Sequence, residues 1–392
     1  MKKFLALTLA LVMSLSLVAC GSKNEEPKTD DTSDTQVEEP TEGAYKIAMI
    51  TDYGDITDQS FNQTTYEACK AFAEDNSIEF NYFKPAGDNT ADRVAMIEKA
   101  VDEGYNVIVM PGYAFGGAIV ETAPKFSDVK FIALDVSAGD LGEGFEVPDN
   151  LYCAVYQEEL CGYMAGYAAV KMGYTKLGFL GGMAVPAVVR YGYGFVQGVD
   201  AAAAETGTEN VTLNYVYGGQ FFGDADITAV MDTWYQHDGV EVVFACGGGI
   251  YTSAVDAAKK ADAKVIGVDV DQAGVIANYA ETEGMTITSA MKGLYPTTYD
   301  TLSDVILNDN WSKYAGQIAT LGLVSADDPE ANYVQIPMGD GTQWCDTFTQ
   351  DDYKAMVKAM YDGELTVSND ITKSPADFAT CIAVEDQGAI KG

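Results

Sequence analysis

Residues 50–63 (ITDYGDITDQSFNQ) bring together three carboxylates and a glycine and end in Ser60-Phe61-Asn62-Gln63, an aromatic ring followed by two amides. The stretch follows an apolar run and precedes a helical pattern, so it predicts a strand–loop–helix connection. In an open α/β sheet, groups at the carboxyl end of a strand face a ligand crevice. Helix capping would explain Ser60, but not an aromatic ring between a cap and two amides. We therefore expect Asp52, Phe61 and Asn62 to form one wall of a binding cleft.

A second loop with binding chemistry is residues 218–224 (GGQFFGD), which follows a predicted strand. It offers an aromatic pair, Phe221 and Phe222, ahead of an aspartate that could cap the next helix. An alternative is that one phenylalanine belongs to the core and Asp224 is only a cap. Aromatic rings at such a position would stack on a flat ligand ring.

Glycines and charged groups occupy the remaining loops of interest. Gly247 and Gly248 lie in a CGGG run between a strand and a helix, where backbone N–H groups could approach a ligand. Asp269, in the segment GVDVDQ, ends a buried strand, where a carboxylate needs partners that ligand hydroxyls would supply. Lys292 follows another strand, and its alternative role is a surface ion pair.

These residue types favour a binding protein over an enzyme. The sequence has no Gly-x-Ser-x-Gly elbow, no Walker A loop and no Gly-x-Gly-x-x-Gly fingerprint. His237 is the only histidine, which leaves little material for a histidine-based triad or zinc site. Hydrolysis by two carboxylates is an alternative, but nothing selects a pair. We expect no catalytic residues, no metal and no cofactor.

The start of the chain predicts export and anchoring. Lys2 and Lys3 precede a short apolar run that ends in Leu-Val-Ala-Cys, which is typical of a signal peptide. The ending resembles a bacterial lipobox, so Cys20 is the expected site of lipid attachment and residues 1–20 the lipoprotein signal peptide. Residues 21–44 are polar and acidic, which predicts a disordered linker between a membrane anchor and the folded part.

The net charge limits the classes of ligand that the protein is expected to bind. The chain has 59 acidic and 23 basic residues among 392, a formal net charge of −36. Nucleic acids and anionic ligands fit such a surface poorly.

The six cysteines after Cys20 are scattered, and their spacing assigns no disulfide.

Apolar runs typical of buried strands alternate with helical patterns from Tyr45 onward. In the first half we expect strands at 46–51, 79–83, 107–110, 130–136 and 151–156, with helices at 64–75, 90–103 and 115–126. The alternation then repeats, with strands at 176–180, 211–217, 240–245 and 264–268 and helices at 157–172, 186–205, 226–237 and 252–261. The end adds strands at 285–291 and 333–336 and helices at 295–308 and 349–362, the last with Thr349 as its cap.

This order predicts an α/β protein with two doubly wound lobes, a hinge and a central cleft. No flexible linker separates the lobes. The expected N-terminal lobe is 45–155 plus about 291–325, and the expected C-terminal lobe is 156–290 plus about 326–392. Rings, carboxylates and amides that meet in such a cleft fit a flat heterocycle carrying a sugar.

Three motifs resemble the basic membrane protein (BMP) family of bacterial lipoproteins, the purine nucleoside-binding components of ABC transporters. They are residues 50–63, the segment GFLGGM at 178–183 with Pro186 and Arg190, and GVDVDQ at 267–272. The resemblance runs from about Tyr45 to Thr366 and implies a type I periplasmic-binding-protein fold. Its lobes would be joined by three crossings and close on the ligand.

The resemblance also implies roles for individual residues. Phe61 would stack on the base, and Phe222, preferred over Phe221, would stack on its other face. Asp52 and Asn62 would bond the base, whereas the ribose hydroxyls would contact the two residues Asp269 and Lys292. We expect Asp55 and Asp58 to be loop and cap residues only.

The expected function follows from the same resemblance. The protein would capture nucleosides outside the cytoplasm, anchored to the cell membrane through lipidated Cys20, and deliver them to ABC permease subunits. Alternatives are binding of another sugar-containing solute, a nucleoside-sensing receptor, or an enzyme that processes sugars or nucleosides.

Overall fold

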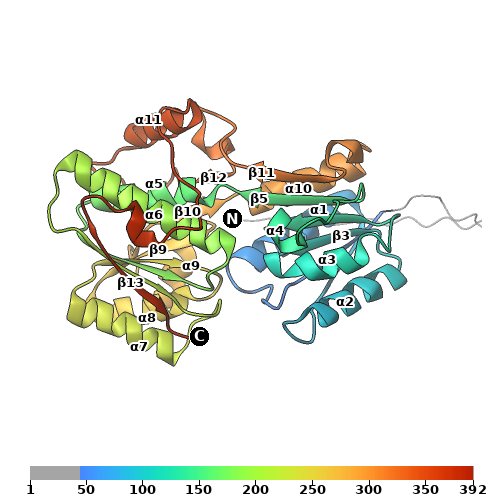
Figure 1. Ribbon diagram of the computed structural model, residues 1–392, viewed down its shortest axis with the longest axis horizontal. Helices are drawn as coiled ribbons and strands as arrows, with labels where there is room; N and C mark the ends of the chain where they lie inside the picture. Colours follow the sequence, from blue (N-terminus) through green and yellow to red (C-terminus); the bar gives the residue numbers. More distant parts are fainter. Residues whose placement is uncertain (1–44, 392) are drawn as a thin grey trace, which may run out of the picture. The chain divides into compact units, whose positions relative to one another are not determined.

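The computed structural model describes residues 45–391, so the predicted signal peptide, Cys20 and the acidic linker lie outside the described residues. Two sheets form the described part (Figure 1). None of its helices combines the length and the apolar character that crossing a membrane requires.

The first sheet has six parallel strands in the order β11-β5-β4-β3-β1-β2. They are β1 (Lys46–Ile50), β2 (Glu79–Phe83), β3 (Val107–Pro111), β4 (Lys130–Leu134), β5 (Leu151–Tyr156) and β11 (Gln317–Leu321). Its main helices are α1 (Phe61–Asn76), α2 (Thr90–Asp102), α3 (Gly116–Thr122), α4 (Ala138–Leu141) and α10 (Leu294–Ile306). Successive residues of β1 point to opposite faces of this sheet, and both faces are covered by helices. Met49 packs in one apolar cluster with Phe72 of α1, and Ile50 packs in another with Ile97 of α2.

The second sheet has seven strands in the order β12-β10-β9-β8-β6-β7-β13, all parallel except the β10–β12 pair. They are β6 (Lys176–Gly181), β7 (Thr212–Tyr217), β8 (Val242–Cys246), β9 (Lys264–Asp269), β10 (Thr286–Lys292), β12 (Val334–Gln335) and β13 (Ala383–Ala389). Its helices are α5 (Glu158–Lys171), α6 (Pro186–Thr206), α7 (Ala225–Thr233), α8 (Tyr251–Ala261), α9 (Ala273–Ala280) and α11 (Gln350–Tyr361).

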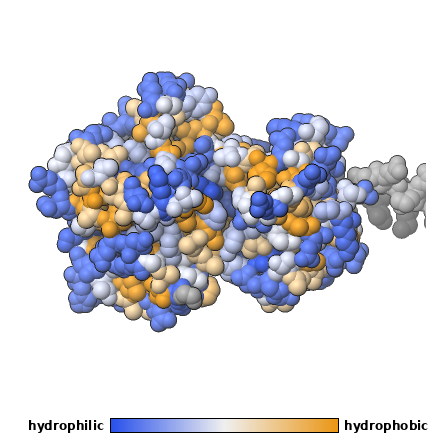
Figure 2. Space-filling view, in the orientation of Figure 1, coloured by the Kyte–Doolittle hydropathy of each residue, from blue (hydrophilic) through white to orange (hydrophobic). Residues whose placement is uncertain are grey.

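By sheet membership, the chain crosses between the sheets after β5, after β10 and after β11. We call the two sheets with their helices the first and second lobes. The residue boundaries that the sequence predicts for the lobes remain a proposal. Each lobe alternates parallel strands with helices, which confirms the predicted doubly wound α/β architecture. Hydrophilic residues are spread over both lobes on the face shown in Figure 2, with smaller hydrophobic patches between them.

Several element predictions were wrong in detail. Helix α1 begins at Phe61 rather than at 64, and the helix expected over 226–237 is α7 followed by a π-helical turn, Trp234–Asp238. Helix α9 and strands β11 and β13 were not predicted. Thr349 caps α11 as expected, because it accepts from the Asp352 N–H while the Asp352 carboxylate accepts from the Thr349 N–H.

Candidate functional site

A cavity of about 350 Å³ lies between the lobes and is lined by residues of both. This volume is at the lower end of the range found for small-molecule pockets, roughly 300–1,000 Å³. Loops at the carboxyl ends of strands supply most of its wall, as expected for an open α/β sheet. All nine residues predicted for the ligand site line it: Asp52, Phe61, Asn62, Phe221, Phe222, Gly247, Gly248, Asp269 and Lys292.

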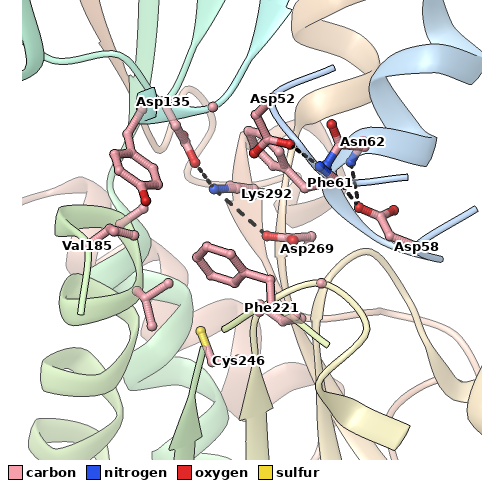
Figure 3. A pocket seen from close by; sticks show the side chains of 18 of the residues that line it. Asp52, Asp58, Phe61, Asn62, Asp135, Val185, Phe221, Cys246, Asp269 and Lys292 are labelled. Atoms are coloured by element: carbon pink, nitrogen blue, oxygen red, sulfur yellow. Dashed lines mark hydrogen bonds and ion pairs between the residues drawn. The ribbon is translucent and has the colours of Figure 1, made fainter. Parts of the chain in front are cut away.

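Lys292, at the end of β10, is at the centre of the site (Figure 3). Its Nζ lies 2.5 Å from Asp135 Oδ2 of the first lobe, 3.5 Å from Glu158 Oε1 and 3.8 Å from Asp269 Oδ1. Only 3 % of its side chain is exposed. The surface ion pair considered for this residue is therefore wrong, because the ion pairs are buried in the cleft.

The electrostatics of this cluster keep Lys292 charged. Burial alone would lower its pKa, but the carboxylates of Asp135, Asp269 and Glu158 raise it well above the usual value. Burial raises the pKa of Asp269, against the opposing effect of Lys292. A second cation, Arg190, donates from Nε to Glu158 Oε2 at 2.7 Å. Three buried carboxylates thus share two cations.

Asp269 is satisfied by protein groups from both lobes. Ser60 Oγ donates to its Oδ2 at 2.5 Å, and the Tyr191 hydroxyl donates to its Oδ1 at 3.3 Å. Asp269 and Asp135 both have left-handed backbones, with φ of 65° and 58°. This conformation costs a residue with a side chain roughly 1–2 kcal/mol, and such costs concentrate at functional sites.

Two residues that line this cavity each have a buried side-chain oxygen without a partner among the described residues. The two oxygens are Asp135 Oδ1 and Asn62 Oδ1. An unsatisfied buried acceptor costs about 1–3 kcal/mol, which a ligand N–H or O–H would recover. They lie in different loops of the first lobe, so one ligand would need donors at two separated points.

The loop after β1 is held by Asp58, not by Ser60. The Asp58 carboxylate accepts from the backbone N–H groups of Ser60, Asn62 and Gln63 at 2.9–3.0 Å, while Ser60 makes no side-chain capping bond to α1. Asp58 is therefore the cap, as expected, and Ser60 is free to reach Asp269. Burial raises the Asp58 pKa to about 6. Asp55 pairs with exposed Lys84 at 2.9 Å, which fits a loop role.

Asp52 and Asn62 lie side by side around Gly54. Asp52 Oδ1 accepts from the N–H groups of Tyr53 and Gly54, both at 2.6 Å. A Cβ on Gly54 would lie 2.3 Å from Asn62 Nδ2, so a larger residue there would displace the Asn62 amide. The turn thereby presents a carboxylate and an amide to the same part of the cavity.

The two phenylalanines of the 218–224 loop differ in placement. Figure 3 shows the Phe61 ring on the first-lobe side of Lys292 and the Phe221 ring pointing into the cavity from the second lobe. Phe222 also lines the cavity, but it is 57 % exposed. Gly247 leaves space for the Phe221 ring, because a Cβ on Gly247 would lie 2.8 Å from it. A Cβ on the next residue, Gly248, would lie 2.9 Å from Phe221 O.

Sequence reasoning missed several residues of the site. Asp135 directly follows the buried strand β4, which stops at Leu134, but the predicted strand 130–136 extended past it. Glu158 and Tyr191 reach the site from the starts of α5 and α6, where no loop signal marks them.

Comparisons with known proteins agree on a family. A family model described as an ABC transporter substrate-binding protein, PnrA-like (Bmp), matches residues 45–326. This match ends at residue 326, whereas the resemblance found in the sequence extended to Thr366. A CD4+ T-cell-stimulating antigen of Listeria innocua is 29% identical over 309 residues, covering 74% of this chain and 80% of that protein.

Two further similarities bear on the fold and the family. The ABC transporter nucleoside-binding protein BmpA of Lactococcus lactis is 26% identical over 285 residues, covering 69% of this chain and 75% of that protein. A solute-binding protein of an ABC transporter system from Aeropyrum pernix superposes with a TM-score of 0.63 at 20% identity, covering 85% and 90% of the two chains. It confirms the type I periplasmic-binding fold. The chain belongs to the Bmp family of PnrA-like ABC transporter substrate-binding proteins.

Proposed function

We propose that this substrate-binding protein captures a purine nucleoside between its lobes and delivers it unchanged to an ABC permease. The observation that carries the proposal is the presence, in one cavity, of an aromatic ring from each lobe, Phe61 and Phe221, together with a buried lysine–carboxylate cluster. Flat rings bind between aromatic side chains, and sugar hydroxyls bind to charged hydrogen-bonding groups.

The base would lie between Phe61 and Phe221, each contact contributing about 0.5–1.5 kcal/mol beyond burial. Phe221 replaces Phe222 as the second platform in this proposal, because the Phe221 ring points into the cavity and Phe222 is mostly exposed. Asp52 would accept N–H groups of the base, and the unpartnered Asn62 Oδ1 would accept another.

The ribose would lie against Asp269, Lys292 and Asp135. The Asp135 Oδ1 acceptor without a partner among residues 45–391 suits a hydroxyl donor. Lys292 would donate to a sugar oxygen, because an ammonium has only donors. A carboxylate has about four acceptor positions, so Asp269 can accept a hydroxyl in addition to Ser60 and Tyr191.

The proposed context is a lipid-anchored protein on the extracytoplasmic face of the cell membrane. Its support is the lipobox-like ending at Cys20 and the family, in which the Lactococcus relative is named as an ABC transporter nucleoside-binding protein. Closure of the lobes would bury the ligand, and the closed form would dock on the permease. The ligand undergoes no chemistry.

Calorimetric titration with a matched panel tests the proposal. Inosine, guanosine and adenosine should bind at one site, with uridine weaker and hypoxanthine, ribose and galactose much weaker. Selective binding of galactose or ribose would instead favour a sugar-binding protein. Failure of every nucleoside to bind would overturn the proposal.

A further inference from the structure

The last strand of the described part lies along the outer edge of the second sheet and ends beside the loop that carries Phe221 (Figure 1). Strand β13 pairs in parallel with β7, from Ala383 opposite Thr212 to Ala389 opposite Tyr217. Its register carries the chain along β7 to the point where the 218–224 loop begins. This strand lies beyond the family match, which ends at residue 326.

The approach to β13 is fixed by side chains of the second lobe. The Asp200 carboxylate accepts from the backbone N–H groups of Thr380 and Cys381, each at 2.8 Å. Farther along, Trp234 Nε1 donates to Gln387 Oε1 at 3.1 Å. The strand is thus attached at both ends, although most of its residues are exposed.

Lys391 then binds the 218–224 loop directly. Ile390 N donates to Tyr217 O at 2.8 Å, which places the next residue over the loop. Lys391 forms an ion pair with Asp224 and donates to Gln220 Oε1 at 3.3 Å. A Cβ on Gly219 would lie 2.6 Å from Lys391 O, so the loop and the terminal segment touch backbone to backbone.

The Gln220 side chain connects the contacts of Lys391 to the backbone next to Phe221. Gln220 Nε2 donates both to Phe222 O and to Asp224 Oδ2, each at 2.9 Å. Asp224 in turn accepts from the N–H groups of Asp226 and Ile227 at the start of α7. Lys391 therefore holds two of the residues that fix the loop around Phe221, whose carbonyl also accepts from the Gly249 N–H at 2.8 Å.

We propose that residues 383–391 are a positioning strand for the ligand-binding loop, with Lys391 as the residue that fastens it. Its consequence for affinity rests on the proposed function. Holding the loop before the ligand arrives lowers the ordering cost of binding, so loss of the fastening should appear mainly as faster ligand dissociation.

The test compares the full-length chain carrying Lys391→Met, Lys391→Arg or the control Lys358→Met. Lys358 pairs with Asp362 at 2.6 Å on the surface of α11, away from the loop. Hydrogen exchange of peptides covering 218–224, measured without ligand, should be faster in Lys391→Met, near wild type in Lys391→Arg and unchanged in the control. Unchanged exchange in Lys391→Met would overturn the proposal.

Nucleoside titration supplies the second readout. Loss of one partly exposed ion pair predicts a decrease in affinity of up to about fivefold for Lys391→Met, with recovery in Lys391→Arg. Faster exchange with unchanged affinity and dissociation rate would overturn the positioning role. If the wild-type protein binds no nucleoside, the proposed function fails, and the exchange measurement still decides whether the strand holds the loop.

Discussion

Ser60 Oγ donates a 2.5 Å hydrogen bond to Asp269 Oδ2, and the two residues belong to different lobes and lie 209 positions apart. The bond exists because Asp58 takes over the capping of α1 and leaves the serine hydroxyl free. Gln272 Nε2 reinforces it by donating to Gln59 O at 3.1 Å, again between the lobes. The helix that presents Phe61 is therefore tied to the strand that presents Asp269.

Replacing Phe61 by alanine should weaken nucleoside binding by more than about tenfold, because one ring of the proposed pair is lost together with its buried area. Phe61→Tyr keeps the ring and should lose much less. Calorimetry with one purine nucleoside compares the three proteins. Equal affinity of wild type and Phe61→Ala would remove Phe61 from the site.

The neighbouring phenylalanines provide an internal comparison. Phe221→Ala should reduce affinity by about tenfold or more, whereas Phe222→Ala should change it by less than about threefold, because the Phe222 side chain is mostly solvated. Both variants stand in the same loop, so a general loop defect would affect them alike. A larger loss in Phe222→Ala would restore that residue as the platform.

Asp269→Asn separates ribose contacts from base contacts. The variant should bind nucleosides much more weakly than wild type, by about tenfold or more, since a charge-assisted bond contributes about 1.5–3 kcal/mol. Its affinity for the free base, measured by competition, should fall far less. Equal losses for nucleoside and base would show that Asp269 does not touch the ribose.

Lys292→Met should reduce the free energy of unfolding by about 3–5 kcal/mol, because it leaves buried carboxylates without their cation. Adding Asp135→Asn should restore part of the loss. The control Lys313→Met breaks an exposed pair with Asp304 and should cost less than about 1 kcal/mol. Denaturant unfolding measures all three, and similar losses for the two single variants would contradict a buried cluster.

Nucleoside affinity should fall as the pH is lowered through about 6, because protonation of Asp58 removes acceptors for the start of α1. Burial raises this pKa from 3.8, so the native state binds the proton more tightly than the unfolded chain does. The contribution of Asp58 to stability therefore decreases as the pH rises from about 4 to about 6. The expected acid effect is thus a loss of affinity with the fold retained.

The variant Asp58→Asn serves as the control for this pH dependence. It should bind more weakly than wild type at pH 7 and show no further change attributable to this group near pH 6. Titrations at pH 5, 6 and 7 make the comparison. The same slope in both proteins would assign the pH dependence to another group.

Much of the fold was predictable because its strands are continuous apolar runs. Strand β3 is buried at every position, and the equally buried β8 follows the same pattern. Strands β11 and β13 were missed for the opposite reason. Both lie at sheet edges, and β13 (AVEDQGA) has exposed polar residues that resemble a loop.

The candidate site was predictable where a polar residue ends a buried strand, as Asp269 does, or follows one within two residues, as Asp52 does. The same rule would have found Asp135 if the end of β4 had been placed correctly. The orientation of Phe221 was not predictable, because it depends on Gly182 and Gly247 of other loops leaving space for its ring. Contacts between distant segments, such as Ser60 with Asp269, likewise depend on the tertiary fold.

Native mass spectrometry after incubation with inosine shows whether the cleft holds an intact nucleoside. The protein should gain the mass of one nucleoside, and chromatography of the released ligand should recover intact inosine after prolonged incubation. Absence of a bound nucleoside at millimolar concentration would contradict the proposed binding. Recovery of hypoxanthine and a sugar product would instead show that the cleft carries out chemistry.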